Sequence, residues 1–175
     1  MNLLTRFREA GLIDAEDYTH VKSWNAAEWT SGASSAVIVS SKAPLETKRR
    51  TMALLEKTVK DPDSGVARIL DSSEIQRLGG CAADFWVELK PGFTFGPQMT
   101  GPLVTESKTR GMHGFLADRR EMNAAFFIAG PGISRSKSLG EIDMRDIAPS
   151  LAAVLGIKLE AAEGHDLLQR RESTK

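Results

Sequence analysis

The sequence predicts an α/β fold, because segments typical of strands alternate with segments typical of amphipathic helices. Residues 34–40 (Ser-Ser-Ala-Val-Ile-Val-Ser) are small and β-branched, as expected of a strand. Residues 44–60 carry apolar residues at helical spacing, and residues 124–129 form an apolar run typical of a strand covered on both faces. The alternation at residues 84–89 and the aromatic pair after it predict a small antiparallel β addition at one edge.

The first 60 residues predict a helix, a polar segment, the first strand and a longer helix. The opening helix ends near Gly11, which suits a helix C′ position. A polar segment spans residues 15–28. The acidic residues at and just before its start, Asp14, Glu16 and Asp17, are expected to begin a helix. Pro44 is expected to open the longer helix, since proline at the first helical position loses no hydrogen bond. Its predicted buried stripe is Leu45, Met52, Leu55 and Val59.

Residues 61–95 predict two more strands with a short helix between them. Residues 66–70 read as a strand, and Ser72 or Ser73 is expected to cap a brief helix that Gly79-Gly80 ends. Residues 84–89 alternate as a strand with one face in water.

The last part of the chain predicts a long loop, the apolar strand 124–129 and a closing helix. Residues 96–111 are rich in Gly, Pro, Thr and Ser, and a loop this long in a compact domain is usually functional or mobile. In the closing helix Asp146 is expected to be the cap, Pro149 lies in the first turn, and Gly156 ends it. Its expected buried residues are Ile147, Leu151, Val154 and Leu155.

The composition fits one globular domain and excludes several classes of partner. The chain has 175 residues, of which 41% are apolar and 26% charged, and its net charge is zero. We therefore expect no bulk attraction to nucleic acid and no nucleic-acid groove. Cys81 stands alone, which excludes an internal disulfide and a Cys-based zinc site. No segment resembles a signal peptide or reaches the roughly 20 apolar residues of a membrane helix.

His113 is the candidate metal ligand, because it lies between glycines at the end of the long loop and just before the apolar run. Glycines there would let the backbone approach a ligand closely, and imidazole is a common zinc ligand. The alternative is a loop histidine bonded to a neighbouring carbonyl. His20 follows Glu16 by four residues, a spacing that could hold a metal on a helix, but we interpret it as structural. His165 lies in the charged tail and is expected at the surface.

No catalytic nucleophile and no cofactor-binding residue can be named from the residues alone. Ser and Thr are plentiful, but none lies in a Gly-x-Ser-x-Gly elbow. The turn Gly130-Pro131-Gly132 lacks the Lys-Ser/Thr of a phosphate-binding loop. A two-metal centre needs several converging Asp and His ligands, and the chain contains no Asp-His pair.

Several segments follow one another in the order found in a known family. They are Gly111-Met112-His113-Gly114-Phe115, then Met122 with residues 126–133 (Phe-Phe-Ile-Ala-Gly-Pro-Gly-Ile), then residues 146–156, then Glu163-Gly164-His165-Asp166-Leu167. This order resembles the carboxy-terminal part of type I phosphodiesterase/nucleotide pyrophosphatases, of the alkaline phosphatase superfamily. Residues 2–12 resemble the segment after the family's Asp-His-Gly metal motif, so the likeness covers nearly the whole chain.

The resemblance implies an alkaline-phosphatase-like sandwich, of which residues 1–175 would be a single partial domain ending in a charged tail, 160–175. It implies a pair of zinc ions, a Thr or Ser nucleophile that attacks phosphorus, and His113 as the last ligand of the zinc on the substrate side. The family's nucleophile, its first aspartate ligand, its Asp-x-x-x-His pair and its Asp-His-Gly motif have no counterpart among these residues. We therefore expect at most a partial zinc site here.

The hypothesis is a carboxy-terminal fragment of a zinc-dependent phosphodiesterase/nucleotide pyrophosphatase-like hydrolase, inactive alone. Its expected partner is the missing amino-terminal half or a second copy of the chain. A nucleotide, a phosphate monoester and a phosphonate all remain open as substrates. So do a truncated gene, a split gene and the compartment, although intact family members are often extracytoplasmic. One alternative is a non-catalytic α/β interaction module that keeps the scaffold. Another is a self-sufficient hydrolase that uses His113 with Asp118 and Glu121.

Overall fold

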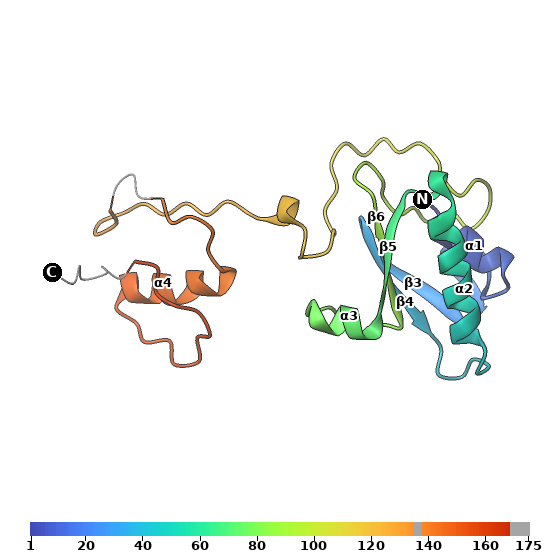
Figure 1. Ribbon diagram of the computed structural model, residues 1–175, viewed down its shortest axis with the longest axis horizontal. Coiled ribbons are helices and arrows are strands. Elements are labelled where there is room, and N and C mark those ends of the chain that lie inside the picture. The colour runs from blue at the N-terminus through green and yellow to red at the C-terminus, as the bar shows by residue number, and fades with distance from the viewer. Residues whose placement is uncertain (135–137, 169–175) are drawn as a thin grey trace. The chain divides into compact units, whose positions relative to one another are not determined.

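The computed structural model describes residues 1–134 and 138–168, which fall into two compact units, Met1–Asn123 and Ala124–Lys175 (Figure 1). Together they confirm a mixed α/β chain. Its strands form two small sheets that are antiparallel throughout, whereas only an antiparallel addition at one edge was expected. The single partial domain expected over residues 1–175 refers to a larger protein, and it stays a prediction. Part of the charged tail, residues 169–175, lies outside the described residues.

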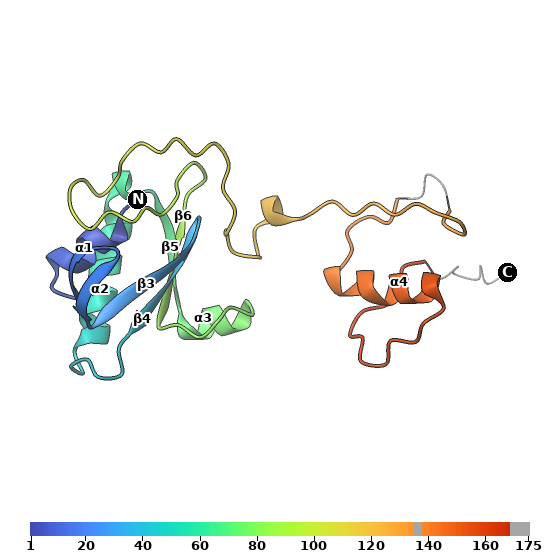
Figure 2. The same ribbon diagram turned by 180° about the vertical axis from the view of Figure 1, so that it is seen from behind.

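The first unit contains most of the regular structure. Its elements are α1 (Leu3–Glu9), β1 (Ile13–Asp17), β2 (His20–Trp24), β3 (Ala26–Ser31), β4 (Ser34–Val39), α2 (Thr47–Lys60), η1 (Pro62–Ser64), β5 (Val66–Asp71), α3 (Ser72–Arg77), β6 (Phe85–Leu89) and η2 (Arg120–Met122). The strands β1 and β2 form an antiparallel hairpin. A second sheet has the order β3-β4-β6-β5, with every neighbouring pair antiparallel (Figures 1 and 2). The strands and helices expected in residues 34–89 are thereby confirmed.

Helices α1 and α2 cover one face of the second sheet and enclose the main core. Fully buried core side chains come from α1, α2 and the central strands: Leu3, Phe7, Val37, Leu55, Val87 and Leu89. The Arg50 guanidinium donates to the Ala10 carbonyl at 3.0 Å and joins the two helices. The expected burial of Leu45 is wrong, because α2 begins only at Thr47 and leaves Leu45 fully exposed.

The helix expected from Asp14 to Asp17 is wrong, since these residues belong to strand β1 of the hairpin. The turn chemistry explains the difference. The Asp17 side chain accepts hydrogen bonds from the backbone N–H groups of Thr19 and His20, at 2.8 and 3.0 Å. An aspartate that bonds the backbone two residues on favours a turn over a helix.

The N-cap of helix α3 lies one residue before Ser72, the first of the two expected caps. Asp71, rather than Ser72 or Ser73, is the N-cap, and its side chain accepts from the N–H groups of Ser73 and Glu74. The Glu74 carboxylate accepts from the Asp71 N–H at 3.0 Å and completes a capping box. Such reciprocal pairing satisfies backbone donors that the first helical turn leaves free.

The second unit is built around η3 (Met144–Asp146) and α4 (Ile147–Leu155). Pro149 lies in the first turn and Gly156 ends the helix in the left-handed region, both as expected. The side chain of Asp146 makes no cap bond and instead accepts from the His165 N–H at 2.8 Å. The expected buried face of α4 is wrong, because Leu151, Val154 and Leu155 are all exposed.

Residues 124–129 do not form the predicted buried strand. Phe127 is 91% exposed, and within the described parts of the chain this segment pairs with no strand. An apolar run is typical of a strand between two covering layers, but a strand also needs a neighbouring strand for its backbone hydrogen bonds. Among the described residues, no helix is both long and apolar enough to cross a membrane.

Candidate functional site

The loop that carries His113 runs from β6 to η2 and is tied to the first unit at several points. The Asn2 N–H donates to the Leu103 carbonyl at 2.7 Å, and the Thr5 hydroxyl donates to the Gln98 carbonyl at 3.1 Å. Farther along, the N–H of Ala33 donates to the main-chain carbonyl of His113 at 3.1 Å. The loop therefore lacks regular structure but has a defined path over α1 and the β3–β4 turn.

The glycines around His113 serve the contact with the β3–β4 turn. Gly114 has φ +82°, and a Cβ there would overlap the Ser31 carbonyl. On the other side of the contact, a Cβ on Gly32 would collide with the His113 carbonyl and with the Met112 side chain. Gly111 has open space around it. The expectation that these glycines admit a ligand is therefore replaced by a close backbone-to-backbone approach, which glycine alone allows.

The His113 side chain is exposed, and its ring makes no hydrogen bond within the described part of the chain. The alternative interpretation, a ring bonded to a neighbouring carbonyl, is not what this loop shows, because the bond to Ala33 uses the main chain. No group of three or more His, Cys, Asp or Glu residues that could hold a metal ion occurs in residues 1–134 and 138–168. A zinc ion bound by protein ligands alone needs three or four of them.

The other two histidines, His20 and His165, have their hydrogen-bond partners outside this loop. His20 Nδ1 lies 3.0 Å from Asp17 Oδ1 across the hairpin turn. Glu16 and His20 are on the two strands of this hairpin, so they do not share a helical face. Glu16 pairs with Lys22 instead, at 2.9 Å. The surface position expected of His165 is confirmed, since its side chain is 92% exposed.

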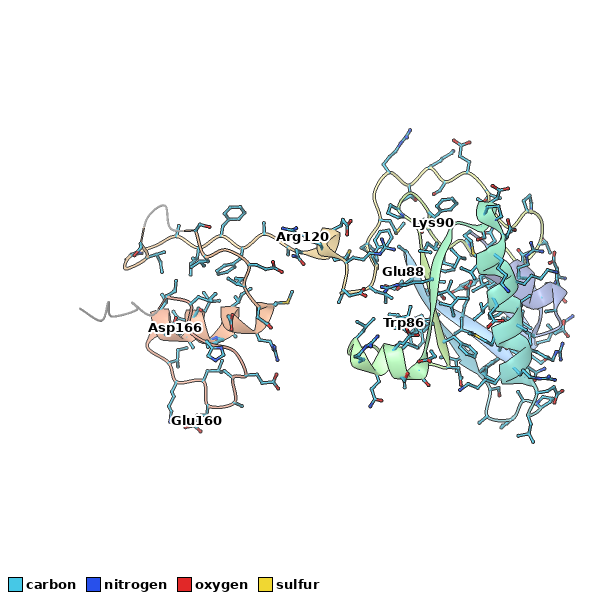
Figure 3. The ribbon with its side chains drawn as sticks, in the orientation of Figure 1. Trp86, Glu88, Lys90, Arg120, Glu160 and Asp166 are labelled. Carbon is cyan, nitrogen blue, oxygen red and sulfur yellow. The ribbon has the colours of Figure 1, made fainter. Side chains whose placement is uncertain are left out.

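An acidic residue that the sequence reading missed anchors the end of the His113 loop. Glu88 lies on β6 and is completely buried, which corrects the expected water-facing side of this strand (Figure 3). Its Oε1 accepts from the Leu116 N–H at 2.9 Å and from Arg119 Nε at 2.7 Å, while Oε2 accepts from Arg68 Nε at 2.7 Å. Arg68 also forms a bidentate pair with Asp118 at 2.9 and 2.6 Å.

These contacts decide the ionisation of both carboxylates. Burial by itself would raise the pKa of Glu88, but the hydrogen bonds from Arg119, Leu116 and Arg68 outweigh it and lower the pKa. The bidentate bond from Arg68 lowers the pKa of Asp118. A carboxylate held in this way is a weak base, so Asp118 is poorly suited to the self-sufficient hydrolase considered from the sequence.

The charged residues of this network are visible in the sequence, but their partnership can be recognised only once the pairing of β5 with β6 is known. Arg68 and Glu88 face each other in the β5–β6 register, and oppositely charged pairs at facing positions stabilise a sheet. Without that register, an acidic residue in an alternating strand is most simply placed on a solvated face.

A cavity of about 870 Å³ lies beside the same loop, between residues 91–98 and residues 104–112. Met112 and Arg110 line it, and so does Phe115, whose ring stacks under the Arg119 guanidinium at 5.2 Å. His113 is not one of its lining residues. The cavity therefore marks the loop's inner side, and the candidate ligand lies outside it.

Comparison with known proteins adds no assignment to this geometry. No family model, no curated protein and no solved structure matches the chain. What the chain does has to be argued from its residues and their arrangement.

Proposed function

We propose that this chain is the carboxy-terminal part of a zinc-dependent phosphodiesterase/nucleotide pyrophosphatase-like hydrolase with an alkaline-phosphatase-like sandwich fold. His113 would supply one metal ligand, and the remaining ligands and the nucleophile would come from residues outside these 175. Each zinc ion needs three or four protein ligands and this chain would supply only one, so we expect no hydrolysis by the chain alone. The partner would be an amino-terminal half or a second copy of the chain.

The observation that carries this proposal is the apolar segment 124–129. Its residues are those of a strand covered on both faces, yet it is extended and uncovered, with Phe127 91% exposed. Exposure of apolar side chains to water is unfavourable, and among the described residues the backbone N–H and C=O groups of this segment lack the hydrogen bonds that a neighbouring strand would provide. A sheet supplied by another chain segment would satisfy both requirements.

The loop geometry supports the role of His113. The main chain is held at His113 itself, whose carbonyl accepts from the Ala33 N–H, and again at Leu116, whose N–H donates to Glu88. The imidazole itself is exposed and has both nitrogens free of partners within the described residues. One ring nitrogen could then take the metal, and the partner that normally orients a ligating histidine through its other nitrogen would have to come from outside these residues.

A complementation experiment tests the proposal. The chain is mixed with the amino-terminal portion of a type I phosphodiesterase/nucleotide pyrophosphatase that ends at its Asp-His-Gly motif, and zinc-dependent turnover of a chromogenic phosphodiester is measured. We expect turnover only in the mixture and its loss in His113→Ala. His165→Ala is the matched control, since this histidine is also exposed, and it should keep full turnover. Turnover unaffected by His113→Ala would overturn the assignment.

One observation favours a second candidate, a non-catalytic α/β interaction module. The first unit closes an apolar core of its own around Phe7, Leu55 and Leu89. The module predicts that zinc and His113→Ala leave the stability unchanged and that no amino-terminal portion restores turnover. The complementation experiment therefore separates the two candidates directly.

A further inference from the structure

A second groove, which His113 does not line, has no place in the proposed hydrolysis. It has a volume of about 460 Å³ and lies along the free edge of β3, beside the β1–β2 hairpin. Its walls combine aromatic and apolar residues with one carboxyl group: Leu4, Tyr18, Trp24, Ala27, Glu28, Trp29, Thr30, Ile38, Phe95, Gly96 and Pro97. This size is within the range of small-molecule sites.

Three aromatic rings of the groove are unusually open to water. Trp29 is 77% exposed, Tyr18 66% and Trp24 43%. Isolated exposed aromatics need no explanation, but these three line one groove. The faces of aromatic rings carry negative potential, and a cation within about 6 Å of a ring centre is attracted to it.

Glu28 adds a carboxyl group whose polar atoms are poorly satisfied. Its Oε1 is inaccessible to solvent and has no hydrogen-bond partner, and its Oε2 accepts only a long bond of 3.4 Å from Ser35. Burial raises the pKa of Glu28 to about 8, against smaller lowering effects of Ser35, the Met1 amino group and the Leu4 amide. A buried acceptor without a donor is costly, so the site lacks a hydrogen-bond donor, preferably a charged one.

We propose that this groove binds a primary alkylammonium group, with Glu28 as its counter-ion and with Trp24, Trp29 and Tyr18 around its charge and alkyl chain. Rotation about the last side-chain torsion of a glutamate is soft, so either oxygen can be turned toward the ligand. The inference is independent of the proposed hydrolase function, because the carboxyl group and the three aromatic rings come from β3 and the β1–β2 hairpin, and His113 takes no part.

The donor requirement narrows the ligand class. A quaternary ammonium would satisfy the rings but offers no N–H to the free carboxylate oxygen. An anion would be repelled by Glu28, and a neutral alcohol would gain neither the charge pair nor the cation–π contact. A free amine and a lysine side chain share the required chemistry, and the two are separated by testing both.

The test is calorimetric titration of the whole chain with n-hexylammonium and with Nα-acetyl-lysine methylamide. n-Hexanol and tetramethylammonium are the matched ligands that lack the charge or the donor. We expect at least one of the two primary ammonium ligands to bind, and each matched ligand to bind roughly tenfold more weakly or worse. Which primary ammonium binds more tightly distinguishes a free amine from a lysine side chain. Equal binding of n-hexanol and n-hexylammonium would overturn the proposal.

Two variants locate the binding. Glu28→Gln keeps the side-chain shape but removes the charge and should weaken n-hexylammonium binding roughly tenfold, whereas Glu46→Gln, exposed and outside the groove, should not. Trp29→Ala removes an exposed ring that the core does not need, and it should weaken binding about threefold. If binding survives both changes in a folded chain, the ligand does not occupy this groove.

Proton release gives a readout that a purely apolar groove would not show. At pH 7 the Glu28 carboxyl is mostly protonated, and pairing with an ammonium group favours its ionised form. Titrations at pH 7 in phosphate and in MOPS, which differ in ionisation enthalpy and carry no primary ammonium group, should report release of about one proton per ligand bound. The release should be smaller at pH 9, measured in borate and in CHES. Tyr18 and the Met1 amino group are the other titratable groups near this carboxyl, and Glu28→Gln should abolish the release. Unchanged release in Glu28→Gln would assign the proton elsewhere and contradict the proposal.

Discussion

At the scale of single residues, two glutamates of the same sheet have opposite environments. Glu88 is fully buried with two arginines and a backbone amide as partners. Glu28 is half-buried, with its Oε1 inaccessible to solvent and one long hydrogen bond from a serine at Oε2. The first pairing holds the carboxylate charged, whereas the second environment favours the neutral acid. Their substitution should therefore have different effects on stability.

Replacing Glu88 should be strongly destabilising. Glu88→Ala leaves two guanidinium groups without their shared carboxylate and frees the Leu116 N–H. We expect a loss of about 3 kcal/mol in the free energy of unfolding, at the low end for a broken buried pair because Arg68 and Arg119 keep contact with water. Urea unfolding followed by tryptophan fluorescence measures it. Glu9→Ala, which removes an exposed pair with Arg6, should cost under about 0.5 kcal/mol, and equal effects of the two variants would contradict this account.

Glu28 should make stability depend on pH. Its pKa is about 8 when folded and near the ordinary value of 4.5 when unfolded, so the folded chain holds the proton more tightly. The stabilisation is complete below about pH 4.5 and is lost as pH rises through 8, with a slope of up to about 1.4 kcal/mol per pH unit. In Glu28→Gln nothing ionises at this position. Between pH 5 and pH 8, wild-type stability should therefore fall relative to the variant, and parallel profiles would show that the group is not buried in this way.

At the scale of elements, local patterns predicted α1, β4, α2, β5, α3 and β6, because each one carries its own periodicity or cap. The hairpin β1–β2 was missed because its turn depends on the side chain of Asp17, which resembles a helix-starting acid in sequence. Residues 124–129 were assigned to a strand because an apolar run reveals propensity, whereas a strand also requires a neighbour. The sequence therefore did not reveal which strands pair with one another.

The glycine pair around His113 tests the loop contact. Gly114→Ala would place a methyl group against the Ser31 carbonyl at a positive φ, whereas Gly111→Ala has open space. We expect Gly114→Ala to cost about 2 kcal/mol and to speed hydrogen exchange of the Ala33 amide, which donates to the His113 carbonyl. Gly111→Ala should stay within about 0.5 kcal/mol. Identical exchange in the two variants would place the loop elsewhere.

At the scale of the whole molecule, the chain is well packed in its first unit and leaves apolar side chains open in its second. The sequence predicted that His113 lies at the end of a long irregular loop, and the structure has it there. This much is predictable because the spacing of glycines is a local property of the sequence. It did not reveal Glu88, Arg68 and Arg119, which hold the end of that loop, because they come from separate elements that only tertiary structure brings together. The sequence therefore predicted the candidate residue, His113, but not the residues that surround and hold its loop.

The open side chains should bind an apolar dye. Phe127 and Leu155 are 91% and 71% exposed, and they belong to the second unit with several other exposed apolar residues. Anilinonaphthalene sulfonate fluorescence should rise with the folded wild-type chain and fall in the double variant Phe127→Ser, Leu155→Ser. Leu45→Ser, a change at a fully exposed leucine of the first unit, is the control and should leave the signal unchanged. A wild-type chain that does not enhance the dye would show that this surface is covered.

The most direct measurement of the central claim is calorimetric titration of the purified chain with zinc, together with turnover of a chromogenic phosphodiester. The account predicts no tight zinc binding and no turnover by the chain alone, with His113→Ala indistinguishable from wild type, because His113 is a single exposed ligand within the described residues. Tight binding of zinc with turnover, both lost in His113→Ala, would mean that the chain completes a metal site by itself. That result would contradict the proposal that its missing ligands come from elsewhere.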